Sequence, residues 1–207
     1  MGKKGEDTRT RILDTAQDMI LGNGYAGVSI DKLISRLGMT KGAFFHHFNN
    51  KSELATALIT RFSDDGVELF KESLARARKF SSDPLQQFMI LIGQYEEIFE
   101  GLEEPYAGCL LASYVYELQQ FSEETREIIN REFLLARKEL TNLFREIMKK
   151  YPPRVDVDIK SLADGFMSLF EGAFVLSKSL QEADVTYQQL QHYKTYIRLL
   201  FDPKLAV

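Results

Sequence analysis

Several features are scarce in this 207-residue chain, and each absence narrows what it can be. Cys109 is the only cysteine, which excludes an intramolecular disulfide and a cysteine-rich zinc site. No apolar run approaches the roughly 18 residues that a membrane-spanning helix needs, and the N-terminal stretch lacks the apolar core of a signal peptide. We therefore expect a cytoplasmic protein with no membrane association.

Strand patterns and catalytic motifs are also missing. Valine and isoleucine are too few and too scattered to form alternating strands. No glycine-rich phosphate loop, metal-spaced cluster or nucleophile–base pair is visible, and His192 stands alone. The sequence predicts an all-α protein that is not an enzyme and has no catalytic residue, metal or cofactor. An enzyme is nevertheless the main rival class, because Glu117 and Glu171 lie on largely apolar segments.

Helical periodicity, capping residues and helix-breaking glycines and prolines predict about nine helices. The expected bounds are 7–22, 29–38, 40–47, 51–80, 84–100, 107–119, 122–150, 158–181 and 187–201. The first three helices are short and the later ones long, which places a domain boundary near residue 50. We expect a helix-turn-helix domain over residues 1–50 and a larger helical domain over residues 51–207.

Charge is distributed unevenly along the chain, although the net charge is only −4. Residues 1–55 carry eight Lys and Arg against six Asp and Glu, whereas residues 56–207 carry eighteen against twenty-four. A mildly basic N-terminal part on an acidic body is typical of a small DNA-binding module joined to a larger domain that does not contact DNA.

The stretch TKGAFFHHFNNK, residues 40–51, has the properties of a helix that enters a DNA groove. Thr40 and Lys41 stand at its N-terminus, where free N–H groups and the helix dipole favour a phosphate. Phe44 and Phe48 are four residues apart, so they share one face and can anchor the helix to its own domain. The alternative is an ordinary short amphipathic helix with solvated lysines. His46 and His47 point about 100° apart, so a shared metal is not expected.

Residues 9–58 resemble the DNA-binding domain of the TetR family of bacterial transcriptional repressors. The likeness is carried by the run RILDTAQDMILGNGYAGVSIDKLISRLGMTKGAFFHHFNNKSELATAL, with its L-G-M-T-K-G turn and its aromatic-His-aromatic ending. The resemblance implies that certain residues meet phosphates or base edges of double-stranded DNA. These are Ser29, Thr40, Lys41, Gly42, Phe45, His46, His47 and Lys51. Phe45 departs from the family pattern, which usually has a tyrosine there whose hydroxyl binds phosphate.

The C-terminal helices predict a homodimer. The segment from residue 158 carries more apolar surface than one intramolecular face requires, and Gly165 and Gly172 permit close helix approach. In relatives the last two helices form a four-helix bundle with those of a partner. The expected interface residues are Gly165, Leu169, Gly172, Leu176, Leu190, Tyr193, Ile197 and Leu200. The alternative is a buried helix pair within a monomer.

The middle of the chain supplies many aromatic and soft side chains, and the resemblance implies a small-molecule pocket there. Candidate lining residues are Tyr95, Phe99, Tyr106, Cys109, Tyr114, Phe133, Phe166 and Phe170. Rings favour an apolar or aromatic effector, although most such side chains belong to the core of a helical protein.

The sequence as a whole predicts a ligand-responsive transcriptional repressor. Its dimer would bind a pseudo-palindromic operator and be released by a small apolar or aromatic effector. One alternative is a regulator that senses electrophiles or oxidants through Cys109, which lies near a helix start. Another is a helical adaptor protein without a small-molecule ligand.

Overall fold

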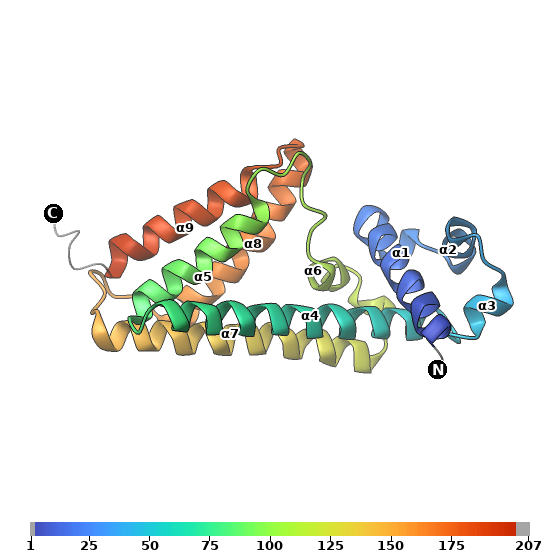
Figure 1. Ribbon diagram of the computed structural model, residues 1–207, viewed down its shortest axis with the longest axis horizontal. Helices are drawn as coiled ribbons and strands as arrows, with labels where there is room; N and C mark the ends of the chain where they lie inside the picture. Colours follow the sequence, from blue (N-terminus) through green and yellow to red (C-terminus); the bar gives the residue numbers. More distant parts are fainter. Residues whose placement is uncertain (1–2, 202–207) are drawn as a thin grey trace. The chain divides into compact units, whose positions relative to one another are not determined.

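The structure is a computed structural model that describes residues 3–201, and these residues form an all-α chain without strands (Figure 1). The expected fold class is therefore confirmed. The elements are α1 (Lys3–Gly27), α2 (Ile30–Leu37), α3 (Lys41–Phe45), α4 (Lys51–Phe80), α5 (Pro84–Phe99), α6 (Leu110–Val115), the 3₁₀ turn η1 (Leu118–Gln120), α7 (Glu123–Lys150), α8 (Ile159–Leu180) and α9 (Val185–Phe201). Within residues 3–201, none of these helices is both long and apolar enough to cross a bilayer.

The chain divides into two compact units whose boundary differs from a single cut near residue 50. The first unit comprises residues 1–65 and 107–132, and the second comprises residues 66–106 and 133–207. The long helices α4 and α7 each contribute to both units, so a change of helix length does not coincide with a change of unit. The short helix α6 and the turn η1 belong to the same unit as α1, α2 and α3.

The first unit is built around the apolar face of α1. Ile12, Ala16, Met19 and Ile20 recur at helical spacing and are buried. The helix begins at Lys3, ahead of residue 7, where the sequence predicts its start, because the charged residues of this segment can continue a helical turn. Its regular course ends at Gly24, whose backbone angles (φ 72°, ψ 162°) are not helical.

The turn between α2 and α3 follows from its capping residues. Gly38 adopts a left-handed conformation (φ 63°), and its N–H donates to the carbonyl oxygen of Ser35. The N–H of Met39 donates to Ile34, which completes the paired hydrogen bonds that close many helices. Thr40 then caps α3 by accepting from the N–H of Ala43 at 3.2 Å. These short-range bonds set the direction in which α3 leaves α2.

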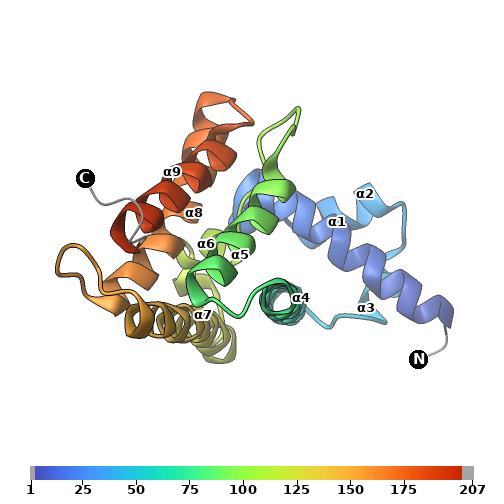
Figure 2. The same ribbon diagram turned by 60° about the vertical axis from the view of Figure 1, so that its left-hand side comes forward.

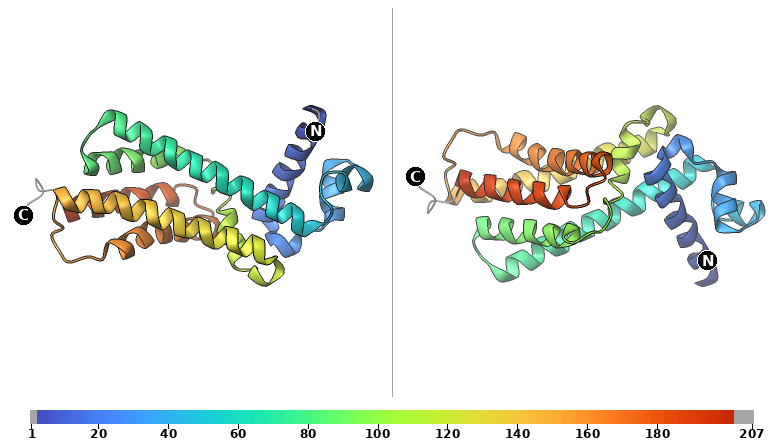
Figure 3. Two further views of the ribbon diagram at one scale, coloured as in Figure 1. Left: turned by 90° about the horizontal axis from the view of Figure 1, so that it is seen from below. Right: turned by 90° about the horizontal axis from the view of Figure 1, so that it is seen from above.

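The second unit packs α5, α8 and α9 around a core of aromatic rings. Figures 2 and 3 show α8 and α9, orange to red, lying side by side, with α5 along α9. Phe88 on α5 is fully buried and its ring contacts Phe144, Phe166 and Tyr193 at centroid distances of 4.8, 6.1 and 6.4 Å. The Tyr193 hydroxyl donates to the Leu162 carbonyl at 2.9 Å, which ties α9 to α8.

A polar anchor of the second unit lies at the start of α5. Asp83 caps the helix by accepting from the N–H of Gln86 at 3.0 Å, and Pro84 occupies the first turn. The same carboxylate accepts from the Lys150 ammonium at 2.5 Å and from the Tyr151 hydroxyl. Although burial acts in the opposite direction, these donors lower the pKa of Asp83 to about 2. The carboxylate therefore stays charged over the whole neutral and mildly acidic range.

Candidate nucleic-acid interface

Helix α3 and the turn that follows it present one buried side and one exposed side, as the four-residue spacing of Phe44 and Phe48 predicts. Phe44 and Phe48 are buried, with ring centroids 6.0 Å apart, and they fix α3 to the first unit. Phe45 stands edge-on to Phe44 at 5.4 Å and is 45% exposed.

Four polar or small residues surround Phe45 on the exposed side. Thr40, Lys41, Gly42 and His46 are all exposed, and an added Cβ at Gly42 would meet no atom within 4 Å. Ser29 is exposed at the start of α2, where its hydroxyl oxygen accepts from the N–H of Lys32 at 3.2 Å. With Phe45, six of the expected DNA contacts therefore lie at the exposed starts of α2 and α3 or on the open side of α3.

Lys41 forms an ion pair with Asp31, a residue that the sequence did not single out. Its Nζ lies 2.7 Å from Oδ1 of Asp31 in the first turn of α2, and both side chains are about two-thirds exposed (67% and 70%). An exposed pair of this kind contributes little stability and exchanges readily for another partner. Asp31 therefore competes with any phosphate for Lys41.

The two histidines differ in their surroundings. His46 is exposed, whereas His47 is half-buried and its ring stands edge-on to that of His46 at 5.2 Å. Burial, followed by the positive fields of His46 and Arg9, lowers the pKa of His47 below its usual value. These surroundings favour the neutral form of His47, which can offer DNA a hydrogen bond.

Lys51 does not extend toward solvent as expected for a phosphate contact. Its Nζ donates to the Tyr25 carbonyl at 2.5 Å and lies 3.8 Å from the centre of the Tyr25 ring. Burial lowers the pKa of Lys51, although the nearby Glu117 carboxylate acts in the opposite direction. The sequence could not reveal this position, because Tyr25 and Lys51 are 26 residues apart and meet only in the folded unit.

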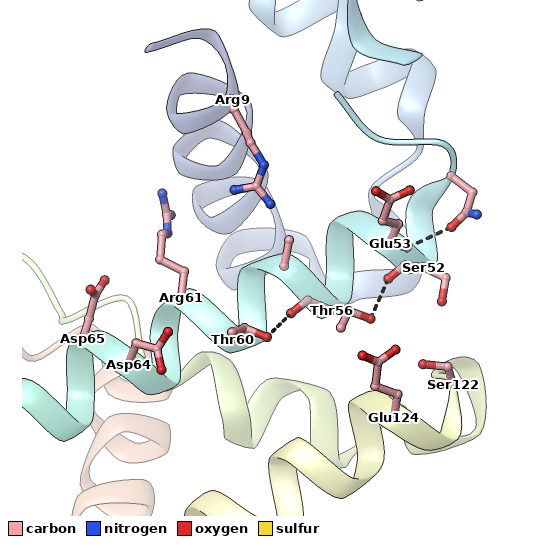
Figure 4. A pocket seen from close by; sticks show the side chains of 12 residues that line it. Arg9, Ser52, Glu53, Thr56, Thr60, Arg61, Asp64, Asp65, Ser122 and Glu124 are labelled. Atoms are coloured by element: carbon pink, nitrogen blue, oxygen red, sulfur yellow. Dashed lines mark hydrogen bonds between the residues drawn. The ribbon is translucent and has the colours of Figure 1, made fainter. Parts of the chain in front are cut away.

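Arg9 is a residue that the sequence analysis missed. Its guanidinium lies 5.0 Å from the centre of the Phe48 ring, on the anchor of α3. Arg9 also borders a groove of about 710 Å³ in the first unit, together with residues of α4 and the start of α7. Figure 4 shows Thr56 and Thr60 along α4, with Arg9 above them and Ser122 and Glu124 below.

The groove contains both positive and negative groups. Its lining residues are Arg9, Asn50, Ser52, Glu53, Thr56, Ala57, Thr60, Arg61, Asp64, Asp65, Ser122 and Glu124. Thr60 donates to the Thr56 carbonyl, Thr56 is bonded to Thr125 at 2.8 Å, and Arg61 is paired with Asp14 at 2.7 Å. A lining of hydroxyls and charges is unsuited to an apolar effector.

Comparison with known proteins identifies the helix-turn-helix region. Residues 12–58, which span most of α1 through the start of α4, match the family model described as bacterial regulatory proteins of the tetR family. The chain carries the DNA-binding domain of the TetR family at residues 12–58, and its relatives and structural neighbours support a regulator of that family. It is a DNA-binding transcriptional regulator, as its relatives are.

Relatives and solved structures extend this likeness along the chain. An uncharacterised helix-turn-helix transcriptional regulator from the lacX 3′ region of Lactococcus lactis is 23% identical over 198 residues, covering 91% of this chain and 92% of the relative. A TetR transcriptional regulator from Chloroflexus aurantiacus has the same fold, with a TM-score of 0.78, 24% identity and coverage of 97% and 98%. The reduced form of NemR from Escherichia coli gives a TM-score of 0.75 at 18% identity, with coverage of 97% and 100%.

The aromatic residues proposed to line an effector pocket of this TetR-family protein fall in both units. Tyr114 and Cys109 belong to the first unit, and the other six belong to the second. Tyr114 is fully buried and stacks on Phe121 with centroids 4.3 Å apart, so it is a core residue of the first unit. Cys109 is half-buried, and its extended backbone directly precedes α6. Phe133 is half-buried on α7.

The remaining candidates form a continuous aromatic cluster in the second unit. Phe170 contacts Tyr95, Phe99 and Phe166 at centroid distances of 5.5, 6.0 and 5.0 Å. Tyr106 extends the cluster, since its ring lies 5.1 Å from Phe99. Burial raises the pKa of Tyr95 to about 12, which keeps its hydroxyl protonated. Phe174, whose ring lies 5.2 Å from that of Tyr106, also belongs to the cluster, although the sequence did not single it out.

The expected dimer residues separate into two groups. On α9, Leu190, Tyr193, Ile197 and Leu200 are buried in the core of the second unit of a single chain. This corrects their assignment to an interface, because side chains already enclosed by their own chain have no surface to offer a partner. The spacing of these residues marks the face of α9 that packs on its own chain. The sequence alone could not distinguish that face from one that packs on a partner chain.

The α8 residues of that prediction remain accessible. Gly165, Gly172 and Leu176 are exposed, Leu169 is half-buried, and an added Cβ at either glycine would meet no atom within 4 Å. Exposed apolar side chains continue from them along both C-terminal helices. These side chains are Val175, Leu176, Leu180, Tyr196 and Leu199.

Proposed function

We propose that this protein is a ligand-responsive repressor. A homodimer would bind a pseudo-palindromic DNA operator and leave it when a small apolar or aromatic effector binds the second unit. The observation that supports this most directly is α3, which is fixed through Phe44 and Phe48 while Phe45 and its polar neighbours stay exposed. A short helix with a rigid inner face and an open outer face is suited to a major groove.

The proposed DNA contacts follow from exposure and chemistry. Ser29, Thr40 and Lys41 lie at the starts of α2 and α3 and would hold phosphates. Gly42 leaves room for close approach, and the Phe45 ring would contact a sugar or a thymine methyl group. His46 would meet a base edge or a phosphate, and His47 in its neutral form would contribute a hydrogen bond. Lys51 is not proposed as a DNA contact, because its ammonium already donates to the Tyr25 carbonyl.

The proposed dimer interface is the outer face of α8 with the adjoining part of α9. Gly165 and Gly172 would let a partner helix approach closely, and Val175, Leu176 and Leu199 would supply apolar contact. A dimer is what a two-fold symmetric operator requires, since each half-site occupies one helix-turn-helix unit.

The proposed effector site is the aromatic cluster around Phe170. Its rings offer an apolar or planar molecule many contacts but few charges. Residues 107–109 join Tyr106, at the edge of this cluster, to α6 in the first unit. An effector that moved Tyr106 would therefore act on α6 along the chain. By thermodynamic reciprocity, operator DNA would weaken effector binding by the same factor.

Selection of DNA from a random-sequence duplex library by the purified protein would test the DNA half of this proposal. We expect an enriched site with two related half-sites about one helical turn apart. Failure to enrich any sequence, even at low salt, would count decisively against a repressor. A thermal-shift screen of apolar and aromatic compounds, followed by release from the selected duplex, would test the effector half.

A second candidate signal is oxidation or alkylation of Cys109. Its half-buried place directly before α6 supports this alternative, and NemR, a structural neighbour, has been solved in a reduced form. Under this alternative, alkylating the native protein should lower operator affinity, and Cys109→Ser should abolish that response. Full alkylation with unchanged operator affinity would remove Cys109 as a sensor.

A further inference from the structure

Helix α1 leaves two backbone N–H groups to be satisfied from elsewhere in the first unit. The helix breaks at Gly24, where φ is +72°, and a new turn begins with Tyr25 and Ala26. The first N–H groups of a helical turn lack partners within it. Both are taken by one side chain, because Oε1 of Glu117 accepts from Tyr25 and Oε2 accepts from Ala26, each at 2.9 Å.

Glu117 thus caps a turn that lies 91 and 92 residues away in the sequence. A carboxylate that accepts from two N–H groups at a helix start is a strong, charge-assisted arrangement. The arrangement also requires Gly24, because an added Cβ there would lie 3.0 Å from Oε1 of Glu117. The break in α1, the glycine at position 24 and the Glu117 carboxylate therefore together make up one helix cap.

Glu117 is itself held firmly. Its own N–H donates to the Tyr114 carbonyl at 3.0 Å, and Nε2 of Gln120 donates to its Oε2 at 2.7 Å. Beneath it the ring of Tyr25 contacts those of Tyr114 and Phe121 at centroid distances of 5.6 and 4.4 Å. The carboxylate is consequently presented to α1 in a fixed position by the segment that follows α6.

The capped turn leads directly into the DNA-binding helices. Val28 donates to the Tyr25 carbonyl at 3.3 Å, and Ser29 follows as the cap of α2. The same Tyr25 carbonyl accepts from Lys51 at the start of α4, and Nζ of Lys32 binds the Gly27 carbonyl at 2.9 Å. Residues 25–28 are thus fixed through their N–H groups by Glu117 and through their carbonyls by two lysines.

We propose that Glu117 is a positioning residue for operator binding. Its carboxylate holds the turn before α2, and thereby the helix-turn-helix, in the orientation that fits DNA, and it transmits movement of α6 to that surface. The inference rests on the proposed operator binding. Losing the cap would lower the fraction of molecules in the competent orientation and weaken apparent affinity in proportion.

The test compares Glu117→Gln with Glu127→Gln, measured on the duplex that the wild-type protein selects. Glu127 is an exposed carboxylate on α7, so both variants remove one negative charge from the first unit. Electrostatics alone would make both variants bind DNA slightly more tightly. The positioning role predicts the opposite sign for Glu117→Gln, with about tenfold weaker binding, which corresponds to about 1.4 kcal/mol. An amide offers only one acceptor oxygen for the two N–H groups.

Two further measurements separate positioning from loss of fold. Affinity is measured well below the melting temperature of each variant, with circular dichroism confirming the helix content. The loss should be equal at 50 and 200 mM salt, because no phosphate contact is removed. Should Glu117→Gln not fold, Glu117→Asp keeps the charge but shortens the reach, and it should still bind more weakly than wild type.

The outcomes are distinguishable. Weak binding by a folded Glu117 variant with normal binding by Glu127→Gln supports the inference. Equal affinity of folded Glu117 and Glu127 variants overturns it and assigns the carboxylate to stability alone. Failure of the wild-type protein to select any duplex would instead refute the proposed operator binding.

Discussion

Removing the positive charge of Lys41 is the most direct perturbation of the proposed DNA contacts. Lys41 is two-thirds exposed and begins α3, so Lys41→Ala should leave folding intact while removing one phosphate contact per subunit. Lys71→Ala is the matched control, because it removes the same charge from an exposed position of α4 in the second unit. Both variants have a net charge of −5, one unit below the −4 of the natural chain.

The size of the effect follows from counterion release. Each neutralised phosphate contributes about 0.9 to the slope of log K against log salt. Between 50 and 200 mM salt, one lost contact should make the fall in affinity about 3.5-fold smaller, and two lost contacts in a dimer about 12-fold smaller. Lys71→Ala should leave the slope unchanged.

Asp31 provides the internal check on this reasoning. An exposed ion pair contributes about 0.2–1 kcal/mol, so Asp31→Asn should free Lys41 and tighten binding by about two- to thirtyfold for two subunits. In the Lys41→Ala background this gain should largely vanish, because the competition no longer exists. Fluorescence anisotropy with the selected duplex at several salt concentrations measures all four variants. An unchanged salt slope in Lys41→Ala would show that Lys41 does not contact a phosphate.

Three further predictions concern stability and assembly. Gly24→Ala should lower the free energy of unfolding by about 1–2 kcal/mol, because φ is +72° there, whereas Gly22→Ala should be neutral or stabilising in chemical denaturation. The folded-state pKa of Asp83, about 2, lies below its ordinary value of 3.8. Its stabilisation of about 1–2 kcal/mol should thus be complete above pH 4 and be lost between pH 4 and pH 2, and an Asp83→Asn variant should lack that acid-dependent loss. Leu176→Glu on the outer face of α8 should convert the proposed dimer to monomer in light scattering, whereas Leu135→Glu on α7 should not, and a dimeric Leu176→Glu protein would contradict the proposed interface.

The parts of the site that the sequence predicted depend on local spacing. Phe44 and Phe48 share a face because they are four residues apart, and Gly38 ends α2 because it tolerates a positive φ. Both inferences use residues within one turn of each other. Lys51 required knowledge of Tyr25, which is distant in sequence, and the same local reasoning placed its ammonium on DNA instead of on a carbonyl.

Helix α9 shows a second limit of sequence pattern. Apolar residues at helical spacing reveal that a helix has a buried face, but they do not reveal whether its own chain or a partner covers that face. Leu190 and Ile197 are enclosed within the second unit, while Leu199 on the same helix is exposed. The face of α9 that is available to a partner chain is thus the exposed one, on which the helical spacing of apolar residues is less regular.

Glu117 combines both limits in one side chain. In sequence Glu117 is a single acidic residue on an apolar segment, a pattern that is equally compatible with a catalytic carboxylate of an enzyme. In the folded unit its two oxygens meet two N–H groups that exist as free donors only because Gly24 breaks α1. A carboxylate and a glycine that are each unremarkable alone therefore acquire a role through the pairing. Because that pairing joins the segment after α6 to the turn before α2, it offers a direct route by which an effector signal could reach DNA.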